Sequence, residues 1–226
     1  MRLLPRPLAG AASVAALLVP ALVTGPVLAA PAGAVTQAGT QVSSRAGAHH
    51  RVATKARIVF VKNEQNPFAS KVVWRQWQRS AGGWRLVDTA EWRAGSGLGG
   101  ARGRSSCVRN VGWLPNGTYT ARPYTDYHGN VIHGRAFRLS NHACGRGTVR
   151  HNLFLHTETG PGNHQCANRP GDQACRWEFP AINDYRSNGC IKLSPTDIAA
   201  LMRHYRRWAA HARAVDLHRF RLVVTG

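Results

Sequence analysis

Residues 187–193 read SNGCIKL, in which a cysteine follows a glycine and opens a short apolar run. That cysteine, Cys190, is one of five in the chain, the others being Cys107, Cys144, Cys166 and Cys175. In an exported protein four of them can pair, and the fifth is left as a free thiol. A free thiol beside a glycine, with a histidine upstream at a strand end, is typical of nucleophilic catalysis.

Residues 1–30 have the pattern of a secretory signal peptide. Arg2 and Arg6 give a positive start, residues 8–28 are apolar, and small residues near Ala29 offer cleavage sites. A retained membrane anchor is the alternative, because the apolar run is long enough to span a bilayer, but two prolines and a glycine interrupt it. We expect export from a bacterial cell to the wall or the medium, without a stable membrane anchor.

The rest of the chain divides at about residue 55. Residues 31–54 are rich in Ala, Gly, Ser, Thr and Gln with no apolar period, which predicts a disordered linker. Residues 55–226 are long enough to bury one core, so one domain is expected there.

The charge balance is strongly basic, with a formal net charge of +20 and 26 arginines among 30 basic residues. Such a field attracts polyanions in a salt-dependent way. An exported protein seldom meets nucleic acid, so anionic cell-wall polymers are the expected partners and nucleic acid is not. The alternative is that the arginines reflect the base composition of a genome, since they are scattered along the chain.

Short β-rich segments separated by turn residues run through the middle of the chain. They cover residues 57–61, 72–79, 84–87, 118–121, 131–139, 150–156 and 220–224. One helix is expected after Ser194, which is followed by a proline and then by an acid at the third helical position. We predict a mostly β, α+β fold with antiparallel sheets and this C-terminal helix packed on them.

The order of residues in the chain restricts the choice of catalytic base. The histidines downstream of Cys190 belong to the helix or to its surroundings, so the base is expected upstream. His156 ends an apolar strand, where a rigid scaffold can present an imidazole. The alternatives are His133 as the base, or His156 as an ordinary histidine at a strand end.

His156, in the segment Leu155-His156-Thr157, and the SNGCIKL stretch together resemble the L,D-transpeptidase family with its YkuD-type catalytic domain. Residues 112–119, GWLPNGTY, are similar to the family segment that precedes a central strand. The resemblance covers residues 55–226 and implies the fold of that catalytic domain.

The resemblance also implies a role for each matched position. Cys190 would be the nucleophile, His156 its base, and the Thr157 carbonyl would orient the imidazole. Backbone N–H groups around Gly189 would form the oxyanion hole, because aimed N–H donors stabilise a developing oxyanion. The candidate substrate-binding residues are Arg186, Ser187, Asn188 and Lys192.

This sequence departs from the family pattern at three places. Asn188 stands where many members have histidine, and Lys192 replaces an arginine or asparagine. The gap of 34 residues between His156 and Cys190 is longer than usual. The excess lies around Cys166 and Cys175, so a disulfide-closed insertion is expected, with Trp177 anchoring its return.

Four cysteines allow three pairings, and we favour Cys107–Cys144 with Cys166–Cys175, since the second closes a short loop. His164, Cys166 and Cys175 could instead bind zinc, but a fourth ligand is not evident and no metal is expected.

The function implied by the resemblance is that of an exported cysteine acyl-transferase acting on peptidoglycan stem peptides. Cys190 would form a thioester with loss of D-alanine, and a second stem amine would take the acyl group, giving a cross-link. Such acyl transfer needs no metal or organic cofactor. The alternatives are trimming of stems by hydrolysis and a non-catalytic basic module that binds the cell wall.

Overall fold

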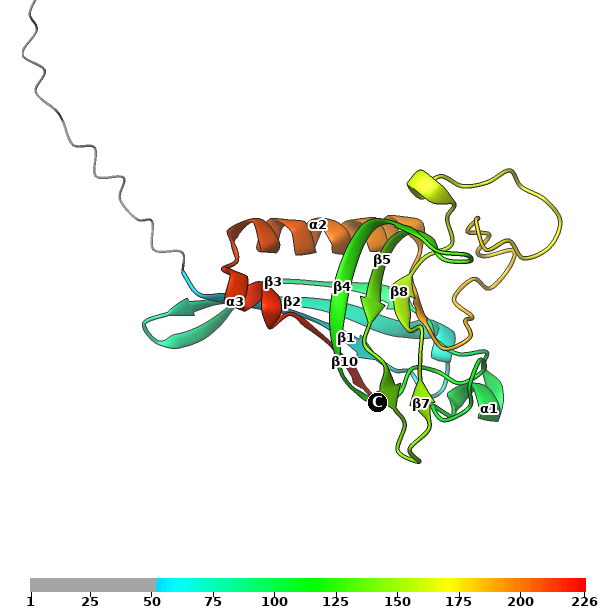
Figure 1. Ribbon diagram of the computed structural model, residues 1–226, viewed down its shortest axis with the longest axis horizontal. Helices are drawn as coiled ribbons and strands as arrows, with labels where there is room; N and C mark the ends of the chain where they lie inside the picture. The colour runs from blue at the N-terminus through cyan, green and yellow to red at the C-terminus, as the bar shows by residue number, and fades with distance from the viewer. Residues whose placement is uncertain (1–51) are drawn as a thin grey trace, which may run out of the picture. The chain divides into compact units, whose positions relative to one another are not determined.

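The computed structural model describes residues 52–226 (Figure 1). The expected signal peptide and the expected linker up to residue 51 lie outside the described residues. None of the helices in the described part of the chain is long and apolar enough to cross a membrane. Strand β1 begins at Thr54, which was expected to be the last linker residue, and the Thr54 hydroxyl donates to the Trp77 carbonyl at 2.8 Å.

Eight strands form one sheet in the order β3-β2-β1-β10-β4-β5-β8-β9, and β6 pairs with β7 separately. The strands are β1 (Thr54–Val61), β2 (Ser70–Ser80), β3 (Gly83–Ala94), β4 (Gly117–His128), β5 (His133–Leu139), β6 (His142–Ala143), β7 (Val149–Arg150), β8 (Phe154–His156), β9 (Ile191–Lys192) and β10 (Arg221–Thr225). The helices are α1 (Gly100–Arg104), α2 (Pro195–His211) and α3 (Ala214–His218), with two 3₁₀ turns, η1 (Pro67–Ala69) and η2 (Pro161–Asn163).

This architecture is the expected mostly β, α+β class, but the sheet is mixed rather than antiparallel. The last strand, β10, inserts between β1 and β4 and runs parallel to β1. β9 runs parallel to β8 at the far edge. The sequence could not show this, because parallel pairing joins strands that are distant along the chain and leaves no turn signal between them.

α2 covers one face of the sheet, running alongside β2 and β3 and passing the ends of β4 and β5 in Figure 1. It buries Ile198, Leu201, Met202 and Trp208. The Trp208 ring lies 5.4 Å from Phe220 and 6.3 Å from Trp74 between ring centroids. Burial of such aromatic and aliphatic side chains is the main favourable term in folding.

The segment expected as one strand over residues 150–156 is interrupted in the structure. Asn152 has a φ of +53°, so the chain turns between β7 and β8. Leu153, Phe154, Leu155 and His156 are all buried, so the strand is covered on both of its faces. β8 also lies between β5 and β9, which places His156 inside the protein.

The start of α2 follows the sequence prediction. The Ser194 hydroxyl accepts a hydrogen bond from the Asp197 N–H at 3.1 Å, and Pro195 takes the first helical position.

We predict that Ser194→Ala lowers the free energy of unfolding by about 1 kcal/mol, because one helix N–H loses its acceptor. Urea denaturation measures this change. Thr196→Ala, at an exposed position of the same turn, is the control, and an equal loss in both variants would contradict the prediction.

Candidate functional site

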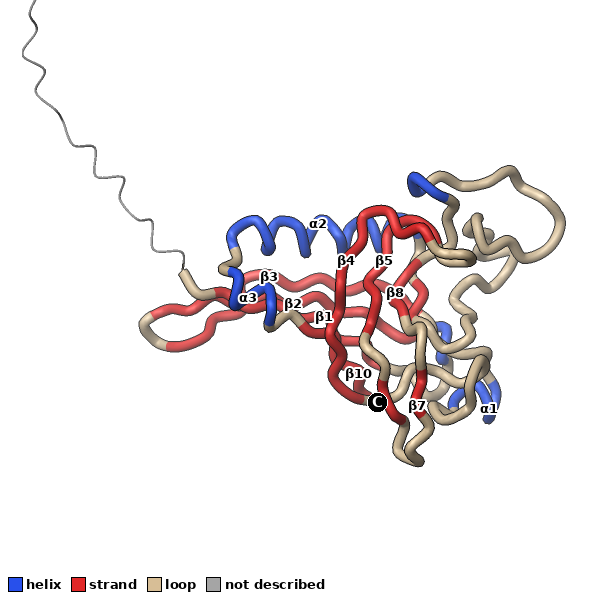
Figure 2. Tube along the Cα trace, viewed as in Figure 1, coloured by secondary structure: helices blue, strands red, loops and turns tan. Residues whose placement is uncertain are grey.

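A cavity of about 540 Å³ lies where β8 and β9 meet the long loop between them. Figure 2 shows this loop in tan at the right of the molecule. His156, Cys190 and Lys192 line the cavity together with the acids Glu158 and Asp172. Arg186, Ser187 and Asn188 line it as well, so all the side chains proposed for catalysis or substrate contact, apart from that of Thr157, border one space.

The parallel pairing of β8 with β9 brings these residues together. His156 is the register partner of Lys192, two positions after Cys190. The Leu193 N–H also donates to the His156 carbonyl at 3.0 Å, which fixes the register. His133 is not among the residues that line the cavity, so the geometry favours His156 as the base.

The imidazole of His156 is held in one tautomer. Its Nδ1 lies 2.8 Å from the Thr157 carbonyl oxygen, which can only accept, so Nδ1 carries the proton and Nε2 is left as the base. Burial and, to a smaller extent, the charge of Lys192 together lower the pKa of His156 to about 3, against the opposing effect of the Thr157 hydrogen bond. The imidazole is therefore neutral at physiological pH.

Cys190 is the one free cysteine among the described residues. Its Sγ lies 3.8 Å from the Asn152 carbonyl oxygen. Burial raises the pKa of the thiol, although a hydrogen bond from Phe154 and the charges of Lys192 and Arg150 act in the opposite direction. Thiol and imidazole are thus both neutral at rest, so nucleophilic attack by this sulfur would require its proton to leave Sγ.

The hydroxyl of Ser187 holds the loop that carries Cys190. It donates to the Cys190 carbonyl at 2.6 Å and accepts from the N–H groups of Gly97 and Gly189. The Ser187 hydroxyl thus ties together the backbone on both sides of Gly189. The Gly189 N–H, expected in the oxyanion hole, donates to the Ser187 hydroxyl at 3.2 Å. The N–H groups of Asn188 and Cys190 are therefore the remaining candidate donors to an oxyanion.

Arg150 lies beneath this loop and was missed by the sequence analysis. Its buried guanidinium donates to the carbonyls of Ser106, Gly112 and Asn188 at 2.7, 3.1 and 3.2 Å. It joins the segment around Gly112 to the cysteine loop and places a positive charge near the Cys190 thiol. Nothing in the sequence distinguishes this arginine from the other 25, because its partners are backbone atoms.

Lys192 forms an ion pair with Glu158 inside the cavity. Burial raises the pKa of Glu158 to about 7 against the opposing charge of Lys192. Glu158, Asp172 and Asp184 each offer a carboxylate oxygen, and these atoms lie within 4.8 Å of one another. A cation could fit among them, but the Lys192 ammonium already supplies positive charge there.

The insertion forms part of the cavity wall. Cys166–Cys175 and Cys107–Cys144 are disulfides, the pairing favoured from the sequence, so Cys166 and Cys175 are not zinc ligands. Asp172 and Ala174, inside the Cys166–Cys175 loop, line the cavity. At the return of the loop, Trp177 packs edge-on against Tyr185 with ring centroids 5.0 Å apart. The two disulfides also fit an oxidising, extracytoplasmic compartment.

No protein-family model matches the chain, and no curated protein matches it. Among solved structures, the chain is similar to that of Bd1075 from Bdellovibrio bacteriovorus, with a TM-score of 0.40 and 11% sequence identity. The alignment covers 77% of this chain and 51% of that one, so the chain spans about half the length of Bd1075. A TM-score of 0.40 is too low to assign a fold family or a function.

Gly189 cannot carry a side chain in this loop. Its φ is +114°, and an added Cβ would meet the Arg150 guanidinium and come within 2.8 Å of the Gly112 carbonyl oxygen. We predict that Gly189→Ala lowers the free energy of unfolding by about 2 kcal/mol or more. Gly145→Ala, with open space around its Cβ, should change it little. Equal denaturation midpoints for the two variants would contradict the prediction.

His156 and Glu158 have opposite effects on stability as the pH falls. His156 has a folded pKa of about 3 against 6.5 when free, so its contribution is lost as the pH falls from about 6.5 toward 3. Glu158 has a folded pKa of about 7 against 4.5, so the folded state gains stability as the pH falls from about 7 to 4.5. The two effects offset each other between about pH 6.5 and 4.5.

Glu158→Gln should therefore make the stability of the protein fall more steeply over this window, by up to about 1.4 kcal/mol for each pH unit. Urea denaturation at pH 6.5 and 4.5 measures the difference between the variant and the parent. Glu91→Gln, at an exposed ion pair with Lys71, should follow the parent. The same pH dependence in Glu158→Gln and the parent would mean that Glu158 does not titrate in this range.

Proposed function

We propose that the protein is an exported cysteine acyl-transferase that cross-links peptidoglycan stem peptides, as an L,D-transpeptidase does. The observation that carries the proposal is the hydrogen bond from His156 Nδ1 to the Thr157 carbonyl in a cavity that also holds the free thiol of Cys190. This bond leaves Nε2 as a base inside a space that contains a nucleophile, the arrangement that cysteine acyl transfer requires.

In the first half of the reaction, Cys190 Sγ attacks the carbonyl carbon after the diamino acid of a stem tetrapeptide. The S–C bond forms as the thiol proton passes to His156 Nε2, and the oxyanion is stabilised by backbone N–H groups of the cysteine loop. Collapse of the tetrahedral intermediate breaks the C–N bond. The imidazolium returns its proton to the departing amine, and D-alanine leaves.

In the second half, the side-chain amine of another stem attacks the thioester. His156 Nε2 takes a proton from this amine and delivers it to the departing Cys190 sulfur, which restores the free thiol. The Lys192 charge near His156 disfavours the imidazolium, so the proton stays only briefly on the ring. The low pKa of His156 makes it a weak base at rest, and we attribute the reaction to a concerted transfer rather than to a preformed thiolate.

The mass of the protein and of its products tests this proposal. After incubation with a purified tetrapeptide stem, mass spectrometry should find an acyl adduct on Cys190, free D-alanine and a cross-linked dimer of stems. Trimmed stems without dimer would indicate hydrolysis instead. The absence of both adduct and products would favour the non-catalytic wall-binding alternative.

We predict that Cys190→Ala abolishes turnover and that His156→Ala slows formation of the adduct on the order of 10²-fold or more. His133→Ala is the matched control and should have little effect, since His133 does not line the cavity. Turnover retained in Cys190→Ala would refute the proposal. A larger effect of His133→Ala than of His156→Ala would transfer the role of base to His133.

A further inference from the structure

The outer face of the sheet, opposite the face that buries Ile58 and Phe60 under α2, carries a row of arginines. Arg57 on β1 is the register partner of Arg75 on β2 and of Arg221 on β10. Adjacent strands lie about 4.8 Å apart, and partners in register project from the same face. Like charges placed directly opposite one another destabilise a sheet, so this arrangement needs an explanation.

The acids near this row do not neutralise it. Glu91 pairs with Lys71 at 2.6 Å, and Asp216 is held by two hydrogen bonds from Arg213. Among the described residues, no carboxylate forms an ion pair with any cation of the row. The same is true of two flanking cations, Lys55 and Arg219.

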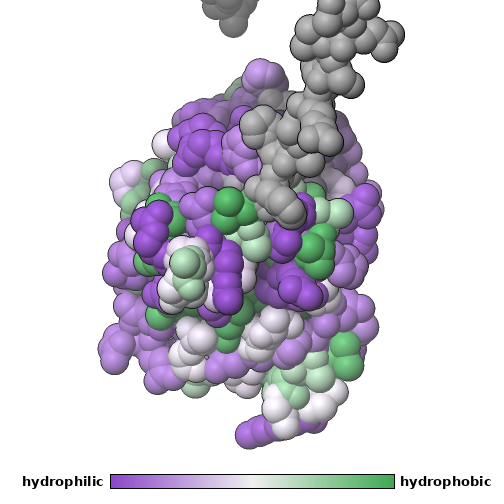
Figure 3. Space-filling view, turned by 90° about the vertical axis from the view of Figure 1, so that its left-hand side faces the viewer, coloured by the Kyte–Doolittle hydropathy of each residue, from purple (hydrophilic) through white to green (hydrophobic). Residues whose placement is uncertain are grey.

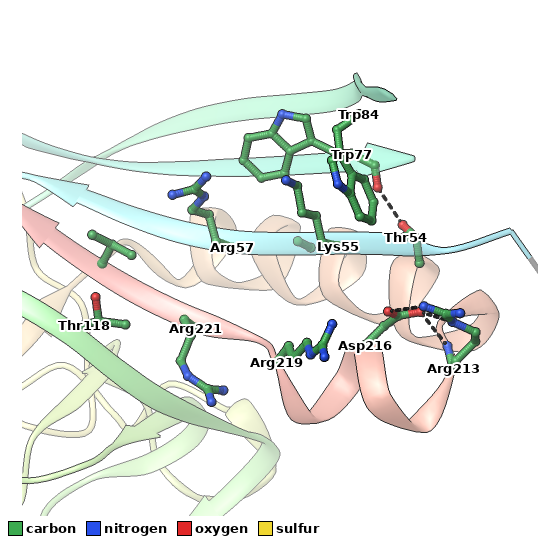
Figure 4. A pocket seen from close by; sticks show the side chains of 12 residues that line it. Thr54, Lys55, Arg57, Trp77, Trp84, Thr118, Arg213, Asp216, Arg219 and Arg221 are labelled. Carbon is green, nitrogen blue, oxygen red and sulfur yellow. Dashed lines mark hydrogen bonds and ion pairs between the residues drawn. The ribbon is translucent and has the colours of Figure 1, made fainter. Parts of the chain in front are cut away.

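A pocket of about 350 Å³ opens on this face, and Lys55, Arg57, Arg219 and Arg221 line it together with Trp77 and Trp84. Figure 4 shows the Lys55 side chain between the two indoles. The Lys55 ammonium lies 4.4 Å from the Trp84 ring centroid and 5.3 Å from that of Trp77. Arg57 lies 4.7 Å from the Trp77 centroid. The tryptophans thus hold cations in place by cation–π contacts.

The protein cannot supply the missing negative charge itself. Residues 1–51 contain no aspartate and no glutamate, so the N-terminal segment would add repulsion. A second copy of the chain carries a net charge of +20 and is repelled as a whole. The visible described surface in Figure 3 is mostly hydrophilic with separate hydrophobic patches, unlike the broad apolar area of a stable protein interface. The charge of this face is complementary to that of a polyanion outside the protein.

We propose that the basic sheet face, defined by Lys55, Arg57, Arg75, Arg219 and Arg221, binds an acidic polysaccharide outside the cell. The guanidinium groups match carboxylate or phosphate oxygens, and several in a row suit a chain of repeated charges. Nucleic acid fits less well, because cations already occupy indole faces on which bases would stack. The face shares no lining residue with the Cys190 cavity, so binding does not depend on the proposed reaction.

The test uses the purified full chain with polygalacturonate as the acidic probe and dextran as the neutral one. Tryptophan fluorescence reports binding at several salt concentrations. We expect the triple variant Arg57→Gln, Arg75→Gln and Arg221→Gln to lose affinity by at least about tenfold and to show a weaker salt dependence. Its unfolding temperature should stay close to that of the parent, because the removed repulsion offsets the lost cation–π contact of Arg57 and the lost hydrogen bonds of Arg221 to the His218 and Phe220 carbonyls.

The matched control changes Arg203, Arg206 and Arg207, which are exposed on α2, to glutamine and so removes the same charge. It should keep its affinity within about threefold of the parent, because α2 covers the opposite face of the sheet. Arg57→Gln alone should also bind polygalacturonate more weakly than the parent, and it tests the proposal with a single change. Equal losses in the two triple variants would overturn the proposal, as would equal binding of dextran.

A single-stranded oligonucleotide with the same number of charges distinguishes the class of polymer. Tighter binding of the oligonucleotide than of polygalacturonate would overturn the assignment to a polysaccharide. Labelling of Cys190 and turnover of stem peptides should be the same in the triple variant and the parent. The two proposals therefore fail separately.

Discussion

The parallel pairing of β8 with β9 is the constraint on which the candidate site depends. It sets Leu155 beside Ile191 and His156 beside Lys192, and thereby brings His156 and Cys190 to one cavity across 34 residues of chain. Because both strands are short, the register needs further support. The loop hydrogen bonds of Ser187 and the bond from the Leu193 N–H supply it.

The second support of the site is a buried charge. Arg150 gives its donors to backbone carbonyls of two loops, so its desolvation is compensated without any carboxylate. The Arg150 guanidinium packs so closely against the backbone at position 189 that only glycine is accommodated there. The same guanidinium also acts on the thiol of Cys190. Its positive charge lowers the pKa of the thiol, whereas burial raises it.

Charge is distributed unevenly over the molecule. The chain is strongly basic, yet three of its ten acids, Glu158, Asp172 and Asp184, gather beside the cavity. The outer sheet face carries arginines in register and uncompensated by acids. In the cavity Lys192 and Arg186 accompany the acids Glu158 and Asp172, whereas cations predominate on the outer face, so the two regions differ in their charge balance.

The sequence by itself determined the elements whose signals are local. The capped helix after Ser194, the mostly β class and the free thiol of Cys190 follow from spacing, composition and cysteine count. Only the tertiary structure decided the mixed sheet, the break at Asn152, the role of Arg150 and the row of arginines around Arg57. These features arise from contacts between residues far apart in the chain, and such contacts leave no periodic pattern in the sequence.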